Sequence, residues 1–233
     1  MDSSPERTFD SVYSSTDCYY GLDVRPEFCD YFDQRDISGL AALDLGCGEG
    51  RYSLYLASKG CHVTSVDCSR AGLSKLEKMA AEESLPIVTC KQDVAEFDFP
   101  AAAFDIIVCA TILDHLEGEL RRRTIRAVRS ALKPGGVLYA NVFTVSDPGC
   151  KGARGGGSRA GGGRGGGSRA AAASGVSDTA ECIAHYFGRE ELKTVFADLS
   201  VITYYETVEP DHSHGRPHYH GWACLLAQKP GAY

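Results

Sequence analysis

The 233-residue sequence predicts an α/β fold: a Rossmann-like parallel sheet with an antiparallel C-terminal edge strand and helices on both faces. Three observations carry this prediction. Short apolar runs alternate with helical segments from residue 40 onward, and such alternation builds a parallel sheet that is covered on both sides. A glycine-rich turn follows the first of these runs. Near the end of the sequence, two further strands are separated only by a loop, which predicts an antiparallel pair.

Local signals place each element within this fold. Short apolar runs predict strands at 40–45, 61–66, 86–90, 104–110, 137–143, 201–208 and 221–228. Helical patterns predict helices at 26–34, 52–58, 69–84, 117–132 and 189–197. Pro26 begins the first of these helices and Ser69 caps the third, whereas Pro134-Gly135-Gly136 ends the fourth.

Composition divides the chain into four segments. Residues 1–38 form a helical and aromatic cap, and residues 39–150 form the Rossmann-like core. Residues 151–175 are rich in glycine and arginine and cannot bury enough apolar area to offset their ordering entropy, so we expect a flexible insertion. Residues 176–233 return to the core with a helix and the terminal strand pair.

Charge and cysteine usage exclude several classes of function. The net charge is −7, and removing the five positive charges of residues 151–175 leaves −12 for the rest, which makes the body a poor binder of polyanions. The Gly/Arg-rich segment has no aromatic side chain for bases to stack on, so nucleic acid is not expected as a partner. Ten cysteines without a C-x-x-C pair, no signal peptide and no apolar run of membrane-spanning length predict a reduced, cytoplasmic protein.

The most informative motif is Leu-Asp-Leu-Gly-Cys-Gly-Glu-Gly-Arg at residues 43–51. Its glycines let the backbone turn sharply and let a ligand approach, as in loops that bind NAD, FAD or S-adenosylmethionine. The spacing G-x-G-x-G differs from the G-x-G-x-x-G typical of pyrophosphate binding. Asp67 ends the next strand, where a carboxylate can accept hydrogen bonds from both ribose hydroxyls, although this feature suits NAD equally well.

Further motifs occur in a fixed order along the core. Asp93 follows the third strand, Phe104-Asp105 opens the fourth, and Leu-Lys-Pro-Gly-Gly precedes the fifth. Together with the glycine loop, these residues resemble the class I S-adenosylmethionine-dependent methyltransferases over about residues 38–145 and the terminal strand pair. The resemblance implies that the chain is an enzyme whose cofactor is S-adenosylmethionine.

The resemblance also assigns roles within the cofactor site. The loop 44–50 would hold the methionine part, Asp67 the ribose, and Asp93 with Val94 the adenine, while Ala110 would pass beneath the methyl group. Arg51 either anchors the cofactor's carboxylate or is a solvated arginine at a helix start. The implied cofactor-binding residues are Asp44, Gly46, Cys47, Gly48, Gly50, Arg51, Asp67, Cys68, Asp93, Val94 and Ala110.

Signals for the methyl acceptor are sparser. The fourth strand continues into Thr-Ile-Leu-Asp-His-Leu, where amino methyltransferases of DNA, RNA or glutamine carry an Asn- or Asp-Pro-Pro-Tyr-like run, so that class is not favoured. Asp114 and His115 fall at the carboxyl end of this strand, where ligands bind in open α/β sheets. A helix cap and a polar surface pair are the alternative interpretations of these two residues.

Four of the seven histidines fall within the run 211–222. We expect this histidine-rich loop to face the acceptor, with an uninvolved surface loop as the alternative. His218 and His220 share a face of an extended chain and could chelate an ion, but no cysteine or carboxylate shows the spacing of a structural zinc site, so no metal site is predicted. The candidate catalytic residues are Asp114, His115, His212, His214 and His218.

The run Gly-Arg-Tyr-Ser-Leu-Tyr-Leu-Ala at 50–57 is similar to that of the tellurite-resistance methyltransferases, which also have a histidine-bearing loop before the last strand, where His212 would correspond. That similarity implies a small-molecule acceptor, and we place a chalcogen or metalloid species ahead of an organic acid, amine or phenol. An arsenite-type enzyme would hold the metalloid with cysteines, and four cysteines outside the strands keep this alternative open: Cys18, Cys29, Cys150 and Cys182. A non-catalytic cofactor- or metal-binding module is the competing class.

Overall fold

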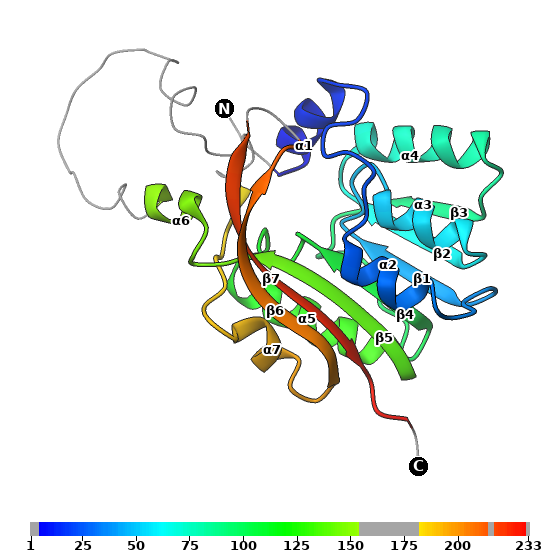
Figure 1. Cartoon of the computed structure of the whole chain (residues 1–233). Coiled ribbons are helices and arrows are strands. Elements are labelled where there is room, and N and C mark those ends of the chain that lie inside the picture. Colours follow the sequence, from blue (N-terminus) through cyan, green and yellow to red (C-terminus); the bar gives the residue numbers. More distant parts are fainter. Residues whose placement is uncertain (1–4, 154–181, 214–216, 232–233) are drawn as a thin grey trace.

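The computed structural model of the chain describes residues 5–153, 182–213 and 217–231. At its centre lies one seven-stranded sheet with the strand order β3-β2-β1-β4-β5-β7-β6 (Figure 1). The strands are β1 (Ala41–Leu45), β2 (His62–Asp67), β3 (Ile87–Lys91), β4 (Phe104–Ala110), β5 (Leu132–Phe143), β6 (Ser200–Asp211) and β7 (His218–Gln228).

The first five strands run parallel, and the sheet changes direction only in its C-terminal part. In the parallel part, Leu43 of β1 lies between Thr64 of β2 and Ile107 of β4. β7 inserts antiparallel between β5 and β6, so β6 occupies the edge. The predicted Rossmann-like sheet with a C-terminal antiparallel pair is therefore confirmed.

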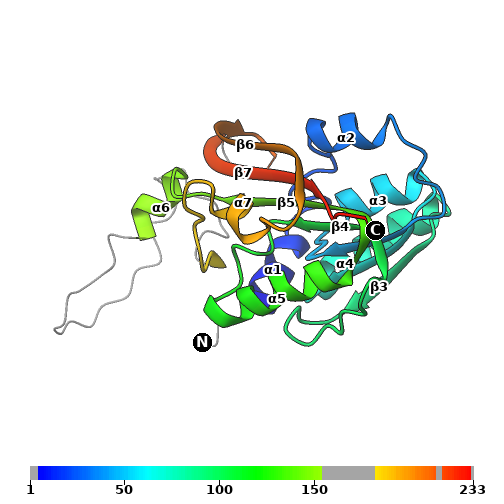
Figure 2. The same cartoon turned by 90° about the horizontal axis from the view of Figure 1, so that it is seen from below.

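Helices cover both faces of this sheet (Figure 2). The helices are α1 (Pro5–Ser14), α2 (Pro26–Phe32), α3 (Arg51–Ser58), α4 (Arg70–Glu82), α5 (Gly118–Ala131), α6 (Pro148–Ala153) and α7 (Glu191–Val195). Side chains of α2 and α3 share one buried cluster with Ala42 of β1, whereas α5 and α7 share the opposite cluster with Leu43. Successive residues of β1 thus face two different cores, which is why every residue of the strand except Asp44 is apolar.

Two helices that were not predicted, α1 and α6, and three strands, β5, β6 and β7, differ from the expectation. Helix α1 was not predicted, because its apolar side chains belong to a surface helix that packs on α4 rather than on the sheet. β5 begins at Leu132 instead of residue 137, since Leu132 already pairs with Phe104 before a register shift. β6 and β7 extend further than predicted and pair Asp211 with His218, so His218 and His220 belong to a strand rather than to a loop.

Two sequence expectations lie outside the described residues: the candidate His214 and the Gly/Arg-rich segment from residue 154 to residue 175. Among the helices that the structure describes, none is long and apolar enough to cross a membrane.

Candidate functional site

A cavity of about 1380 Å³ opens at the carboxyl ends of β1, β2, β4 and β5 and extends to the β6–β7 hairpin. This edge of a parallel sheet is where open α/β folds bind their ligands. The volume exceeds the range of roughly 300–1,000 Å³ that is usual for a single small-molecule site. The cavity therefore has room for two ligands side by side.

The glycine loop forms one wall of the cavity. The amides of Gly46 and Cys47 donate to the carbonyl of Val66 at 2.8 and 3.1 Å, which holds the loop against the end of β2. Gly50 is the N-cap residue of α3 and has φ +89°, and a Cβ there would lie 2.4 Å from Leu76 Cδ1. A side chain at this position would be strained both by the left-handed backbone and by the lack of space.

Asp67 lies beside the glycine loop and is nearly fully buried. Its two carboxylate oxygens accept hydrogen bonds from the amide of Ser69 at 2.7 Å and from that of Gly48 at 2.8 Å. Burial raises the pKa of this carboxyl above its ordinary value. Each oxygen keeps a further lone pair, so a carboxylate fixed in this way can still accept the hydroxyls of a ribose.

Asp44 supplies a second buried carboxylate, only 1% exposed, at the start of the glycine loop. Its Oδ2 accepts a hydrogen bond from the Ser53 hydroxyl at 2.6 Å, whereas Oδ1 has no hydrogen-bond partner among the described residues. Burial raises the pKa of Asp44 to about 6. A buried carboxylate oxygen without a partner, on the wall of a cavity, fits the positively charged amino group of S-adenosylmethionine.

The structure brings the expected cofactor residues to this one cavity. Its lining includes Asp44, Gly46, Cys47, Gly48, Gly50, Arg51, Asp67, Cys68, Asp93, Val94 and Ala110. The side chain of Val94 is buried and apolar, as a contact for an adenine ring requires. The guanidinium of Arg51 lies 3.4 Å from the carbonyl of Asp23 and also lines the cavity, so both interpretations of this residue stay open.

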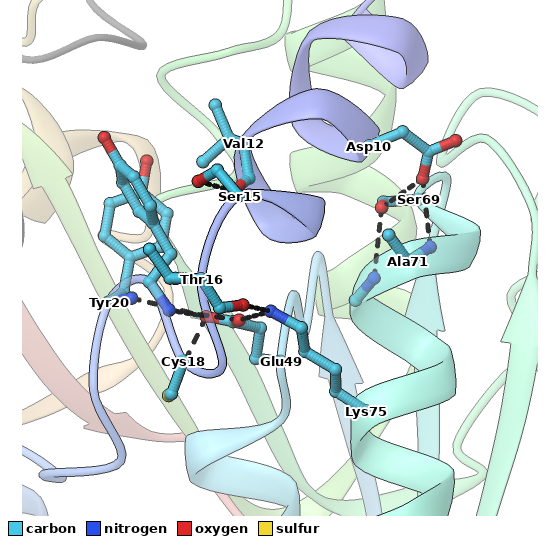
Figure 3. A network of polar contacts seen from close by, with 12 residues as sticks. Asp10, Val12, Ser15, Thr16, Cys18, Tyr20, Glu49, Ser69, Ala71 and Lys75 are labelled. Carbon is cyan, nitrogen blue, oxygen red and sulfur yellow. Dashed lines mark hydrogen bonds and ion pairs between the residues drawn. The ribbon is translucent and has the colours of Figure 1, made fainter.

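Glu49 joins the N-terminal segment, residues 5–20, to the glycine loop, and it was not among the predicted site residues. The Glu49 carboxylate accepts hydrogen bonds from the amides of Tyr19 and Tyr20 at 2.8 and 3.3 Å, and Lys75 of α4 approaches it to 2.6 Å. Lys75 also donates to the carbonyl of Thr16. Figure 3 shows the carboxylate between the ammonium group and the backbone of the segment.

A second attachment joins α1 to the start of α4. Asp10 accepts hydrogen bonds from the Ser69 hydroxyl at 2.5 Å and from the amide of Ala71 at 3.0 Å (Figure 3). The hydroxyl of Tyr13, from the same helix, lies against Gly48, where a Cβ would be 2.6 Å away. Helix α1 thus packs directly on the glycine loop and, through Phe9 and Tyr13, lines the cavity.

Aromatic side chains form the other half of the cavity. The rings of Phe143 and Trp222 stack with centroids 4.4 Å apart, and the Arg25 guanidinium lies 4.8 Å from the Trp222 ring. Arg25 pairs with Glu209 of β6 at 2.6 Å. Oδ1 of Asn141 is buried there without a hydrogen-bond partner among the described residues. This half therefore offers flat apolar walls and a few polar atoms that converge on one space.

The candidate catalytic residues divide into two groups. His115 and His212 line the cavity, and Nδ1 of His115 lies 3.0 Å from the carbonyl of Cys182. Asp114 is fully buried behind the wall and accepts a hydrogen bond from the amide of Phe143 at 3.1 Å. His218 is also buried, and neither it nor Asp114 is among the described residues that line the cavity.

Two residues of the aromatic half of the cavity, His220 and Asp147, were not among the candidate catalytic residues. His220 lines the cavity, and its Nδ1 lies 2.8 Å from Oδ2 of Asp147, which also accepts a hydrogen bond from the amide of Gly221 at 2.9 Å. The His-x-His spacing already indicated that His220 shares a face with His218. Asp147 carried no such signal, because it follows β5 and meets His220 only through the pairing of β5 with β7.

Comparison with known proteins identifies the core. Residues 42–136 match the family model described as a methyltransferase domain. The ubiquinone biosynthesis O-methyltransferase of Marinobacter nauticus is 32% identical over 125 residues, which are 52% of each chain. The chain thus spans about half the length of the curated relatives it matches.

Solved structures agree with the fold. TehB from Haemophilus influenzae superimposes with a TM-score of 0.67 at 23% identity, covering 96% of this chain and 66% of that chain. The N-methyltransferase NodS from Bradyrhizobium japonicum, in complex with S-adenosyl-L-homocysteine, gives a TM-score of 0.64 at 16% identity and covers 97% of this chain and 98% of that chain.

The sheet order, the glycine loop and the matched segment together define the class. Residues 42–136 are a methyltransferase domain, and the fold is that of solved S-adenosylmethionine-dependent methyltransferases, so the predicted class I resemblance is confirmed and the predicted cofactor is the one that this match supports.

Proposed function

We propose that the chain transfers a methyl group from S-adenosylmethionine to a small-molecule acceptor. One observation carries this proposal: a single cavity joins the glycine loop and Asp67 at one end to the aromatic and histidine side chains at the other. A methyltransferase needs this arrangement, because donor and acceptor must meet in one space that holds both.

The cofactor brings the reactive group. When bound, S-adenosylmethionine supplies an electrophilic methyl group whose C–S bond breaks as the acceptor's lone pair takes the carbon, and the electron pair of that bond stays on sulfur. The protein's task is to hold the two molecules. Asp67 would hold the ribose, Asp44 the amino group and Val94 the adenine. Positioning alone can contribute on the order of 7–11 kcal/mol to lowering the barrier.

In the acceptor half, the histidines would handle the acceptor's proton. His212 and His115 line the cavity, and a neutral imidazole can take a proton from a hydroxyl, thiol or amine. Asp114 would act as a positioning residue, since it holds the backbone of Phe143 in the cavity wall. His214 and His218 complete the set of catalytic candidates.

Two acceptor classes have support. The Gly50–Ala57 run that resembles the tellurite-resistance methyltransferases favours a chalcogen or metalloid acceptor, and Cys182 on the cavity wall keeps an arsenite-type acceptor open. The stacked Phe143 and Trp222 rings favour a flat organic acceptor instead, in line with the names of the O-methyltransferase relatives. We place the enzyme in the cytoplasm, as expected from its cysteines.

A screen of acceptors with methyl-labelled S-adenosylmethionine tests the proposal. The panel contains selenite, tellurite, arsenite, small thiols and catechols, and Asp67→Ala serves as the inactive control. Label transfer to at least one acceptor, lost in the control, is the expected result. If S-adenosylhomocysteine binds and no acceptor is labelled, the non-catalytic binding module is the better account.

A further inference from the structure

The β6–β7 hairpin gathers three potential metal ligands at its end. Asp211 at the end of β6 pairs with His218 at the start of β7, and His220 follows two residues later on the same face. One ligand atom from each of these three side chains lies within 4.8 Å of the other two. The two histidines are 8% and 4% exposed, so the cluster is built into the fold.

The rings of His218 and His220 meet at their Nε2 atoms, and the carboxylate of Asp147 holds the ring of His220 from the other side. Nε2 of His218 lies 2.8 Å from Nε2 of His220, while Nδ1 of His220 lies 2.8 Å from Oδ2 of Asp147. A neutral imidazole carries one proton, and in His220 it lies on Nδ1, which donates a hydrogen bond to Asp147, so Nε2 of His220 carries a lone pair. A carboxylate behind a histidine in this manner is the usual outer shell of a metal-binding histidine.

We propose that Asp211, His218 and His220 bind one divalent transition-metal ion such as Zn²⁺. Two imidazoles and one carboxylate are a donor set that such ions accept, and three protein ligands leave one position open. With Zn–N bonds of about 2.0 Å, tetrahedral ligands lie about 3.3 Å apart, so the two Nε2 atoms need to separate by only about 0.5 Å.

This proposal reverses the sequence expectation of no metal site. Asp211 is seven residues from His218 in the chain, and that spacing matches no structural zinc motif. The hairpin nevertheless places Asp211 directly opposite His218. Strand pairing, which the spacing of residues does not reveal, supplies the third ligand.

The open position faces the cavity, because both Asp211 and His220 contribute to its lining. This part of the inference rests on the proposed function: the ion would bind the acceptor through a hydroxyl oxygen or a thiol sulfur. Coordination lowers the pKa of such a group, so the acceptor binds as the anion and its proton passes to His212 or His115, which line the same cavity. The acceptor class that this site fits is therefore an acidic hydroxyl or a thiol, with the nucleophilic atom held at the metal.

Metal titration of the full chain tests the site without any need for activity. Zn²⁺ is added to protein freed of metal by a chelator, and binding is followed by calorimetry. We expect one tight equivalent per chain, with affinity at least tenfold weaker in Asp211→Asn and in His218→Gln. Asp147→Asn, which removes the outer carboxylate, should weaken binding by about 10–100-fold. His62→Ala, an exposed histidine at the start of β2, is the matched control and should bind like the parent.

Circular dichroism of each variant separates lost ligands from lost folding. Asp211→Asn decides the outcome if the histidine variants unfold, because Asp211 is only partly buried and asparagine can still accept the bonds from Ser213. A parent chain that binds no Zn²⁺, or folded variants that bind it as tightly as the parent, would overturn the proposal.

The open position has its own readout. In the Co²⁺-loaded chain, azide should change the visible absorption bands if one coordination position is free, and unchanged bands would contradict an open site. S-adenosylhomocysteine is titrated into the same samples. If the chain binds Zn²⁺ but transfers no label in the acceptor screen, the metal site is supported and the proposed methyltransferase activity is not. If the chain transfers label but binds no Zn²⁺, the proposed activity is supported and the metal site is not.

Discussion

The two halves of the cavity are built in different ways. The cofactor half comes from a contiguous loop at 44–51 and from the ends of the neighbouring parallel strands, so nearly every residue in it adjoins a motif. The acceptor half joins Phe143, Asp211 and Trp222, which the antiparallel pairing of β5, β6 and β7 brings together, and Arg25 from the start of α2 lies against the Trp222 ring. Local sequence thus specifies the proposed cofactor site, and strand register specifies the proposed acceptor site.

This difference suggests a division of labour. The Rossmann-like half keeps its geometry because glycines and buried carboxylates leave few alternatives at those positions. The acceptor half is held by strand pairing, and an exposed residue such as His212 can change there without disturbing the sheet. Substitutions in the two halves should therefore separate cofactor binding from turnover.

The largest effect is expected in the acceptor half. His212→Ala should lower turnover by about 10²–10⁴-fold while S-adenosylhomocysteine binding survives, because the side chain lies on the cavity wall away from the glycine loop. Steady-state kinetics on the acceptor found by the screen provides the measurement, with His62→Ala as the control. Parent-like turnover in His212→Ala would remove this histidine from the catalytic account.

Next in size is a change in the glycine loop. Gly50→Ala should cost about 2–5 kcal/mol of unfolding free energy, because the left-handed backbone disfavours alanine and the new Cβ meets Leu76. Gly39→Ala is the matched control, since Gly39 has φ +76° and nothing within 4 Å of the added Cβ. Equal losses in the two variants, measured by urea unfolding, would show that the contact with Leu76 is unimportant.

A smaller effect is expected where the N-terminal segment joins the cofactor half. Glu49→Gln removes the charge that Lys75 approaches to 2.6 Å and should lower stability by about 1–2 kcal/mol. The variant should also expose residues 5–20 to proteolysis sooner than in the parent. The control is Glu82→Gln, which alters the exposed ion pair between Glu82 and Lys78 on α4, the helix that carries Lys75. It should change the free energy of unfolding by less than about 0.5 kcal/mol. Similar melting temperatures for both variants would argue against Glu49 as the attachment point.

The smallest effect concerns pH. Burial raises the pKa of Asp44 from 3.8 to about 6, so the stability associated with its protonated form is present below pH 3.8 and lost as the pH rises through 6. The amino group of the cofactor favours the ionised form, and S-adenosylhomocysteine affinity should therefore fall about tenfold from pH 7 to pH 5. Asp44→Asn should flatten this dependence, and any remainder belongs to Asp67, whose pKa is also raised. A slope that Asp44→Asn leaves unchanged would mean that Asp44 does not face the amino group.

The sequence was a good guide where function depends on neighbouring residues. The parallel sheet, the glycine loop and the place of Asp67 at a strand end follow from local patterns, because a parallel sheet with short crossovers must place its strand ends at one edge. Helix α1 and the Glu49 attachment were not predictable, since both depend on contacts between segments about 30 to 60 residues apart. The pairing of Asp147 with His220 depends on the register of β5 against β7, which a single sequence does not reveal.

Calorimetric titration of S-adenosylhomocysteine into the parent, Asp67→Asn and Asp67→Ala tests the central claim most directly, with NAD as the competing ligand. Asparagine can still accept one loop hydrogen bond, so Asp67→Asn guards against simple loss of the loop's conformation. The account predicts one S-adenosylhomocysteine per chain, affinity weakened by about 1.5–3 kcal/mol in both variants, and no tight binding of NAD. Tight binding of NAD, or S-adenosylhomocysteine affinity that neither substitution changes, would contradict it.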